Sequence, residues 1–232
     1  KDGIFWLHQK IGSYILTFEK LTSLISELNI KVIFWMDDLH YTKNINDARY
    51  KNSDIIISPS IHYFKNINSK LLNKSKFLSY FFDEDIINKY NPFNTYDKRE
   101  NKIILSGKIS KSYRSRVVIF KEASINKNIY HILEHPNYYN TIHNKYHINY
   151  YDYLSQFKGA IFGLANYPIN FLLAKVIEIL GCGCLGFFEF SEQYKDYLGL
   201  IEWYHYIPIY KDKNNNLILD NNLFMKYLTS RK

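Results

Sequence analysis

The chain has 232 residues, of which 47% are hydrophobic and 22% charged, so it can bury a sizeable core and is not a disordered segment. Its formal net charge is +8, but lysines and arginines are scattered along the chain, as are its 22 tyrosines. This dispersal favours a solvated basic surface over the concentrated patch of a nucleic-acid-binding protein. No apolar run reaches the roughly 20 residues of a membrane-spanning helix.

Cysteine usage and the start of the chain indicate the compartment. The two cysteines, Cys182 and Cys184, cannot form a disulfide framework, and no secretory signal opens the sequence. We therefore expect a cytoplasmic protein. The chain begins at Lys1 without methionine, and we expect it to be a fragment of a longer protein.

The first half alternates between helical and strand patterns. Apolar residues at spacings of three and four predict an amphipathic helix over 13–28. Buried strands are predicted at 31–35, 54–58 and 76–81, with weaker helical segments between them.

A polar segment at 88–101 lacks periodicity, contains Pro92 and is the best candidate for a linker. We therefore expect two domains, at 1–95 and 96–232.

The second half repeats the alternation of strands and helices more clearly. Strands are predicted at 102–106, 128–133, 158–164, 184–189 and 205–210, and helices at 114–124, 148–157 and 170–180. Such alternation predicts a parallel sheet covered on both faces. The fold class expected is therefore α/β, with two Rossmann-like domains, the first short or incomplete.

One candidate binding loop, SGKISKSYRSR at 106–116, follows the first of these strands. Ligands of parallel α/β proteins lie beyond the carboxyl ends of the strands. Gly107 permits tight backbone geometry there, and Lys108 and Arg116 lie near a helix start, where phosphate binds readily. The loop has neither Walker nor G-x-G-x-x-G spacing, so an ordinary turn before a basic helix face is the alternative.

A second candidate lies in the helix predicted over 170–180, with Asn170 as its N-cap. Lys175 and Glu178 are neighbours on one face at i and i+3. A buried carboxylate needs partners, and a ribose diol is one. The alternative is an exposed ion pair that contributes about 0.3 kcal/mol.

The turn after this helix contains both cysteines and two glycines. Two thiolates fall short of the four ligands of a structural zinc site, so we interpret Cys182 and Cys184 as small buried residues and expect no metal or cofactor. Gly181 and Gly183 are expected to end the helix and let the next strand start.

The stretch KVIEILGCGCL at 175–185 resembles the donor-site signature of GT-B glycosyltransferases of the group 1 type. In that family an E-x7-E pattern opens and closes a short helix, and the closing glutamate binds the donor ribose. Asn170 stands here at the opening position and Glu178 at the closing one. The stretches KIILSGK and YRSR, which contain Gly107 and Tyr113, similarly resemble the first strand and phosphate loop of the donor domain. The likeness is to divergent members from spore-coat and large-virus surface glycosylation.

The resemblance implies a metal-independent glycosyltransferase. It would move a sugar from a UDP- or GDP-linked donor to a hydroxyl of a glycan or protein acceptor, in the host cytoplasm if the protein is viral. The implied donor-binding residues are Gly107, Lys108, Tyr113, Arg116, Asn170, Lys175 and Glu178. The first domain would serve the acceptor. Because Asn170 departs from the family pattern, a catalytically degenerate nucleotide- or glycan-binding module is the alternative.

The acidic turn MDDLHY follows the predicted strand at 31–35. One interpretation is a carboxylate metal site of the GT-A kind, and another is a strand-end turn whose aspartate caps the next helix. A third places Asp38 or His40 at the interdomain cleft as the base that accepts the acceptor proton. Asp38 and His40 are therefore the candidate catalytic residues, and His8 is a further cleft candidate.

Overall fold

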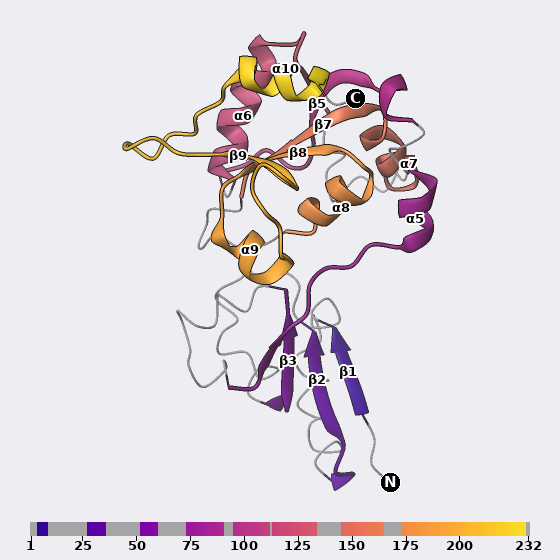
Figure 1. Cartoon of the computed structure of the whole chain (residues 1–232). Helices are drawn as coiled ribbons and strands as arrows, with labels where there is room; N and C mark the ends of the chain where they lie inside the picture. The colour runs from indigo at the N-terminus through magenta and orange to yellow at the C-terminus, as the bar shows by residue number, and fades with distance from the viewer. Residues whose placement is uncertain are drawn as a thin grey trace. The chain divides into compact units, whose positions relative to one another are not determined.

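A computed structural model describes residues 4–8, 27–35, 52–59, 73–90, 95–111, 113–133, 145–164 and 173–230, with the backbone alone at 4–8 and 145–149. The chain divides into two compact units, residues 1–79 and 80–232. Each unit contains its own parallel sheet (Figure 1).

The first unit holds a four-stranded sheet in the order β1-β2-β3-β4, and every neighbouring pair is parallel. Its strands are β1 (Ile4–His8), β2 (Lys31–Trp35), β3 (Ile55–Ser58) and β4 (Ser75–Phe77). The structure thus confirms the strands predicted at 31–35 and 54–58. The third, predicted at 76–81, is only Ser75–Phe77, so residues 78–81 are not part of it. Strand β1 was not predicted. Of the helix predicted over 13–28, all but the last two residues lie outside the described residues.

The second unit holds a five-stranded, fully parallel sheet in the order β6-β5-β7-β8-β9. Its strands are β5 (Glu100–Leu105), β6 (Tyr130–Ile132), β7 (Phe157–Phe162), β8 (Leu185–Glu189) and β9 (Tyr206–Ile209). Its α-helices are α5 (Glu84–Lys89), α6 (Arg114–Ile125), α7 (Lys145–Leu154), α8 (Lys175–Gly181), α9 (Glu192–Leu198) and α10 (Asn221–Ser230). All five strands predicted in this half are confirmed, and α5, α9 and α10 are additions.

Helices cover both faces of this sheet, as predicted, because alternate side chains of each strand point to opposite sides. On one face Ile104 and Phe188 are buried in a cluster with Leu154 of α7 and Ile179 of α8. On the other face the neighbouring strand residues are buried with α6 and α10, in a cluster that includes Ile103, Leu105, Phe187, Ile119, Phe224 and Leu228. None of the described helices is long and apolar enough to cross a membrane.

The strand order fixes where a ligand would bind. After β5 the chain places β6 on one side and then β7 on the other, so the connections leave β5 in opposite directions. In open parallel sheets, ligands bind beyond the carboxyl ends of strands at such a switch point. The carboxyl ends of β5 and β7 are therefore the place to look for a site.

The described residues of the polar segment, 88–90 and 95–101, belong to the second unit, since the division between the units falls between Ser79 and Tyr80. The buried Arg99 guanidinium donates hydrogen bonds of 2.9 Å to the carbonyl oxygens of Tyr90 and Cys182. These bonds connect the segment before β5 to the end of α8.

Candidate functional site

The loop after β5 brings two cationic side chains to one glycine. Gly107 has φ of +95°, in the left-handed region that favours glycine. A Cβ atom on Gly107 would lie 2.9 Å from Nη1 of Arg116 and 3.5 Å from Cε of Lys175. The absence of a side chain at Gly107 therefore lets the side chains of Arg116 and Lys175 come close to the backbone of this loop.

The end of β7 lies directly against the start of α6. A Cβ atom on Gly163 would be 2.8 Å from Cβ of Ser115 and 3.0 Å from the backbone nitrogen of Arg116. The N-terminus of α6, with its partial positive charge, thus lies at the switch point between β5 and β7.

Arg116 organises the loop between β5 and α6. Its side chain is buried, and Nη1 donates a 2.8 Å hydrogen bond to the carbonyl oxygen of Lys108. The guanidinium also lies 4.1 Å from the ring centroid of Tyr113, the N-cap residue of α6. Lys108 is itself exposed. These contacts bring together the four residues predicted in this loop.

The predicted pair on α8 is present and partly buried. Nζ of Lys175 lies 2.8 Å from Oε2 of Glu178, and the two side chains are 23% and 22% exposed. Lys175 and Glu178 therefore do not form the exposed ion pair that was the alternative interpretation. Helix α8 begins at Lys175, five residues later than predicted, with Ala174 as its N-cap and Glu178 in its first turn.

Two further side chains complete the cluster, and the sequence analysis missed both. The Lys175 ammonium donates a 2.5 Å hydrogen bond to the hydroxyl of Tyr150 on α7 and lies 3.9 Å from that ring's centroid. The same hydroxyl is 2.9 Å from Oγ of Ser106, the residue before Gly107. Ser106 could have been suspected from its place directly after a strand, whereas Tyr150 carried no signal beyond its helical pattern.

The protonation states in this cluster follow from burial and charge. Burial by itself lowers the pKa of Lys175, but Tyr150 and Glu178 outweigh it, so the pKa is raised and the amine stays charged at neutral pH. Burial raises the pKa of Tyr150 although Lys175 opposes it, so the hydroxyl stays protonated. The cluster therefore offers a charged amine and the protonated hydroxyl of Tyr150 at neutral pH.

A buried carboxylate lies further along the same edge of the sheet. Glu189 ends β8 and is 1% exposed. It accepts a 2.7 Å hydrogen bond from the backbone N–H of Leu164, just after β7, and pairs at 2.7 Å with Nζ of Lys211, just after β9. It thus connects the ends of three neighbouring strands, and the sequence analysis missed it.

The cysteines are buried residues of the turn after α8, as predicted. Gly183 has φ of +68° and its N–H bonds to the carbonyl oxygen of Leu180, while the N–H of Cys184 bonds to that of Ile179, which is a Schellman helix end. Burial raises the pKa of both thiols, that of Cys184 to about 12. Within the described parts of the chain, no three histidine, cysteine or acidic side chains are grouped to hold a metal ion.

Three predicted site residues, Asp38, His40 and Asn170, lie outside the described residues. His8 falls in β1, where the backbone alone is described. The binding and catalytic roles assigned to these four residues stay predictions, whereas the prediction of Asn170 as N-cap of α8 is wrong, because Ala174 has that position.

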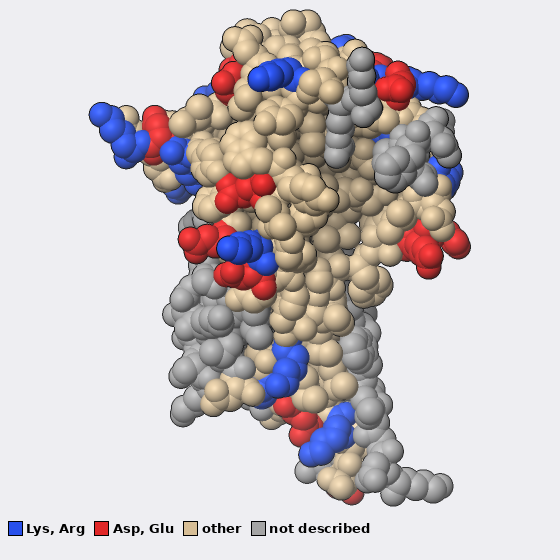
Figure 2. Space-filling view, in the orientation of Figure 1, with Lys and Arg blue, Asp and Glu red and all other residues tan. Residues whose placement is uncertain are grey.

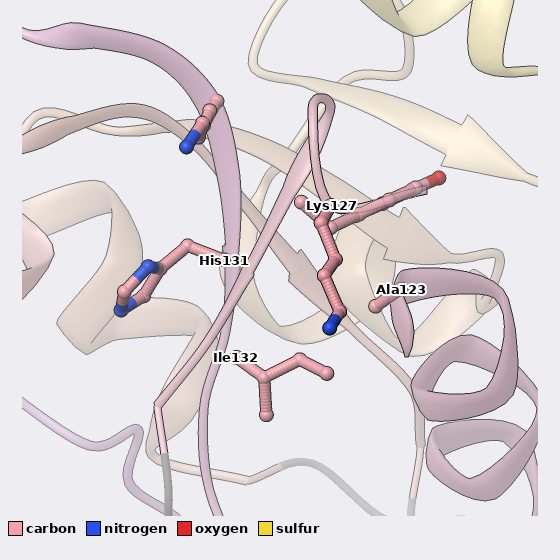
Figure 3. A pocket seen from close by; sticks show the side chains of 6 residues that line it. Ala123, Lys127, His131 and Ile132 are labelled. Atoms are coloured by element: carbon pink, nitrogen blue, oxygen red, sulfur yellow. The ribbon is translucent and has the colours of Figure 1, made fainter. Parts of the chain in front are cut away.

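A hollow of about 300 Å³ lies elsewhere, along the edge strand β6 and the turn after α6 (Figure 3). It is lined by Lys102, Ala123, Lys127, Tyr130, His131 and Ile132. Figure 3 shows the side chains of Lys127 and His131 on different sides of the strand ribbon. The amine of Lys127 and the imidazole of His131 therefore do not converge, and the cluster at the switch point is the stronger candidate.

Charge is dispersed over the visible surface. In Figure 2 the blue basic and red acidic side chains lie interspersed among uncharged ones, without a large field of one sign. This agrees with the scattered lysines and arginines of the sequence.

The chain matches no family model, and no curated protein matches it in sequence. Its fold is similar to two crystal structures of HepE from Anabaena. The structure with UDP and glucose has a TM-score of 0.54 at 7% identity, and the match covers 98% of this chain and 67% of that one. The structure with UDP-glucose has a TM-score of 0.50 at 8% identity, with 86% and 62% covered. The likeness shows a mixed α/β, Rossmann-like fold, and the chain spans about two thirds of HepE.

Proposed function

We propose that this chain is a glycosyltransferase whose second unit binds a UDP- or GDP-linked sugar where β5 and β7 end. The observation that carries the proposal is the partly buried Lys175–Glu178 pair beside Gly107. HepE, whose fold is similar, was crystallised with UDP and glucose and with UDP-glucose, which supports a nucleotide-sugar donor.

The diphosphate of the donor is proposed to lie beside Gly107. The missing side chain lets Arg116 and Lys175 approach the backbone here, and these two cations and the N-terminus of α6 surround this point with positive charge. These groups stabilise the charge on the leaving diphosphate, which is the role of a divalent cation in other sites. We therefore propose transfer without an obligatory metal, in a two-domain arrangement of GT-B type.

Glu178 is proposed to bind the ribose hydroxyls. A carboxylate has about four acceptor positions, so Glu178 can keep its contact with Lys175 and accept a ribose hydroxyl as well. Each hydrogen bond to a charged group contributes about 1.5–3 kcal/mol. The carboxylate thus accounts for a large part of nucleoside affinity.

In the transfer step, the acceptor hydroxyl oxygen forms a bond to the anomeric carbon. The bond from that carbon to the phosphate oxygen breaks, and its electron pair leaves on the diphosphate. The hydroxyl proton goes to a base, for which Asp38 and His40 are the candidates from the sequence. The acceptor is a glycan or a protein.

The alternative is a nucleotide- or glycan-binding module without transferase activity, and Asn170 in place of the opening glutamate favours it. Both functions require donor binding, and they differ in turnover. Release or transfer of the sugar from UDP- and GDP-sugars in the presence of EDTA supports the transferase. Tight donor binding without any turnover supports the binding module.

Calorimetry with UDP, GDP and UDP-glucose tests the donor site. Glu178→Ala is expected to weaken binding at least tenfold. Glu192→Ala is the matched control, because Glu192 is also in the first turn of a short helix but is exposed. Unchanged affinity in the Glu178 variant contradicts the assignment of this site.

A further inference from the structure

The hydroxyl of Tyr150 lies at the centre of the cluster, between the loop after β5 and helix α8. We propose that Tyr150 is a positioning residue that holds the Lys175 ammonium toward the phosphates of the donor. The inference rests on the proposed function and deepens it. Tyr150 affects the phosphate part of the ligand through Lys175, whereas Glu178 binds the ribose part.

The contacts of Lys175 hold a flexible side chain in one place. An ammonium has three N–H donors. One is directed at Oε2 of Glu178 at 2.8 Å and one at the Tyr150 hydroxyl at 2.5 Å, which leaves a third for a phosphate oxygen. Ordering a free lysine side chain costs conformational entropy on binding. Here Tyr150 and Glu178 have already ordered it.

The direction in which Lys175 is held follows from the second contact of the tyrosine. Its hydroxyl is 2.9 Å from Oγ of Ser106, and Ser106 directly precedes Gly107. The position for a Cβ on Gly107 is 3.5 Å from Cε of Lys175. The hydroxyl thus connects the lysine to the loop proposed to hold the diphosphate.

Tyr150→Phe separates this role from packing. The change removes the hydroxyl and both of its hydrogen bonds, but keeps the ring against which the ammonium lies at 3.9 Å. Tyr153→Phe is a matched control on the same helix, because Tyr153 is exposed.

The test is calorimetry with uridine, UMP and UDP, or with the guanosine series if GDP is the nucleotide bound. Tyr150→Phe is expected to weaken UDP binding about tenfold and to leave uridine binding within twofold of wild type. Glu178→Gln is expected to weaken all three ligands. Tyr153→Phe is expected to change the binding of none of them.

Ser106→Ala provides a second variant, because it removes the other partner of the Tyr150 hydroxyl. It is expected to weaken UDP binding about threefold and to leave uridine binding unchanged. The inference is overturned if Tyr150→Phe leaves UDP affinity unchanged, or if it weakens uridine and UDP equally. A wild-type chain that binds none of these ligands removes the proposed function itself, and this inference with it.

Discussion

Replacing Glu189 by alanine tests how the carboxyl edge of the second sheet is held together. The carboxylate is 1% exposed, accepts the N–H of Leu164 at 2.7 Å and pairs with Lys211 at 2.7 Å. Alanine leaves the buried N–H of Leu164 without its acceptor, which costs about 1–3 kcal/mol. It also leaves a cavity and removes the partner of Lys211, whose side chain is 28% exposed. The lost hydrogen bond, the cavity and the lost ion pair together give an expected loss of about 3–5 kcal/mol.

Glu189→Gln divides this loss into its parts. Glutamine keeps the volume and an oxygen that can accept the N–H of Leu164, so the ion pair alone is lost. Because the Lys211 side chain is 28% exposed, its ammonium can be solvated, and we expect the glutamine variant to lose about 1 kcal/mol.

Urea unfolding followed by far-UV circular dichroism measures both losses, and hydrogen exchange at the Leu164 amide reports the hydrogen bond directly. The alanine variant is expected to exchange faster at Leu164, and the glutamine variant to keep its protection. Glu192→Ala, at an exposed position, should stay within about 0.5 kcal/mol of wild type. A loss below about 1 kcal/mol in Glu189→Ala, with the Leu164 amide still protected, would show that Glu189 does not hold this edge of the sheet together.

Three other changes probe the same unit. Gly163→Ala places a Cβ 2.8 Å from Cβ of Ser115. We expect this crowding to lower the free energy of unfolding in urea by about 1–3 kcal/mol. A change under about 0.5 kcal/mol contradicts the close approach. Tyr194 is fully buried, and its hydroxyl has no hydrogen-bond partner among the described residues. Tyr194→Phe should therefore raise the free energy of unfolding by about 1 kcal/mol. A lower melting temperature for this variant contradicts the prediction. Burial raises the pKa of Cys184 from 9.0 to about 12. The neutral thiol of Cys184 therefore makes its full contribution to the free energy of unfolding below pH 9, and this contribution is lost as the pH rises toward 12. A thiol reagent at pH 8.5 should therefore modify Cys182 and Cys184 when the chain is unfolded in urea and leave the native chain unmodified, and equal rates contradict the burial.

The sheet of the second unit was predictable because its strands contain short runs of apolar residues, such as 103–105 in β5 and 160–162 in β7. All six residues of β7 are buried, as expected for a strand covered on both faces. The Lys175–Glu178 pair was predictable for a different reason. Residues three apart on a helix are neighbours, whatever the rest of the fold does.

Element ends were predicted less well, because several residues offer similar local signals. Asn170 is a good N-cap residue by type, yet α8 begins at Lys175 after Ala174, which makes no side-chain cap. Helix α9 was missed although Ser191 caps its start and Gly199, with φ of +64°, ends it. Both of those signals are present in the sequence.

The contacts that complete the site depend on the tertiary fold. Tyr150 meets Ser106 across 44 positions of sequence, and Glu189 meets the N–H of Leu164 across 25. No periodicity or spacing rule connects residues so far apart. They become neighbours because a parallel sheet brings the carboxyl ends of its strands to one edge.

We propose that a nucleotide binds where β5 and β7 end, with its ribose on Glu178. A crystal structure of the chain with UDP would show whether it does. We expect the diphosphate beside Gly107 and the N-terminus of α6, with a ribose hydroxyl within about 3 Å of the Glu178 carboxylate. UDP bound elsewhere on the chain, or a Glu178 side chain turned away from the ribose, would contradict it.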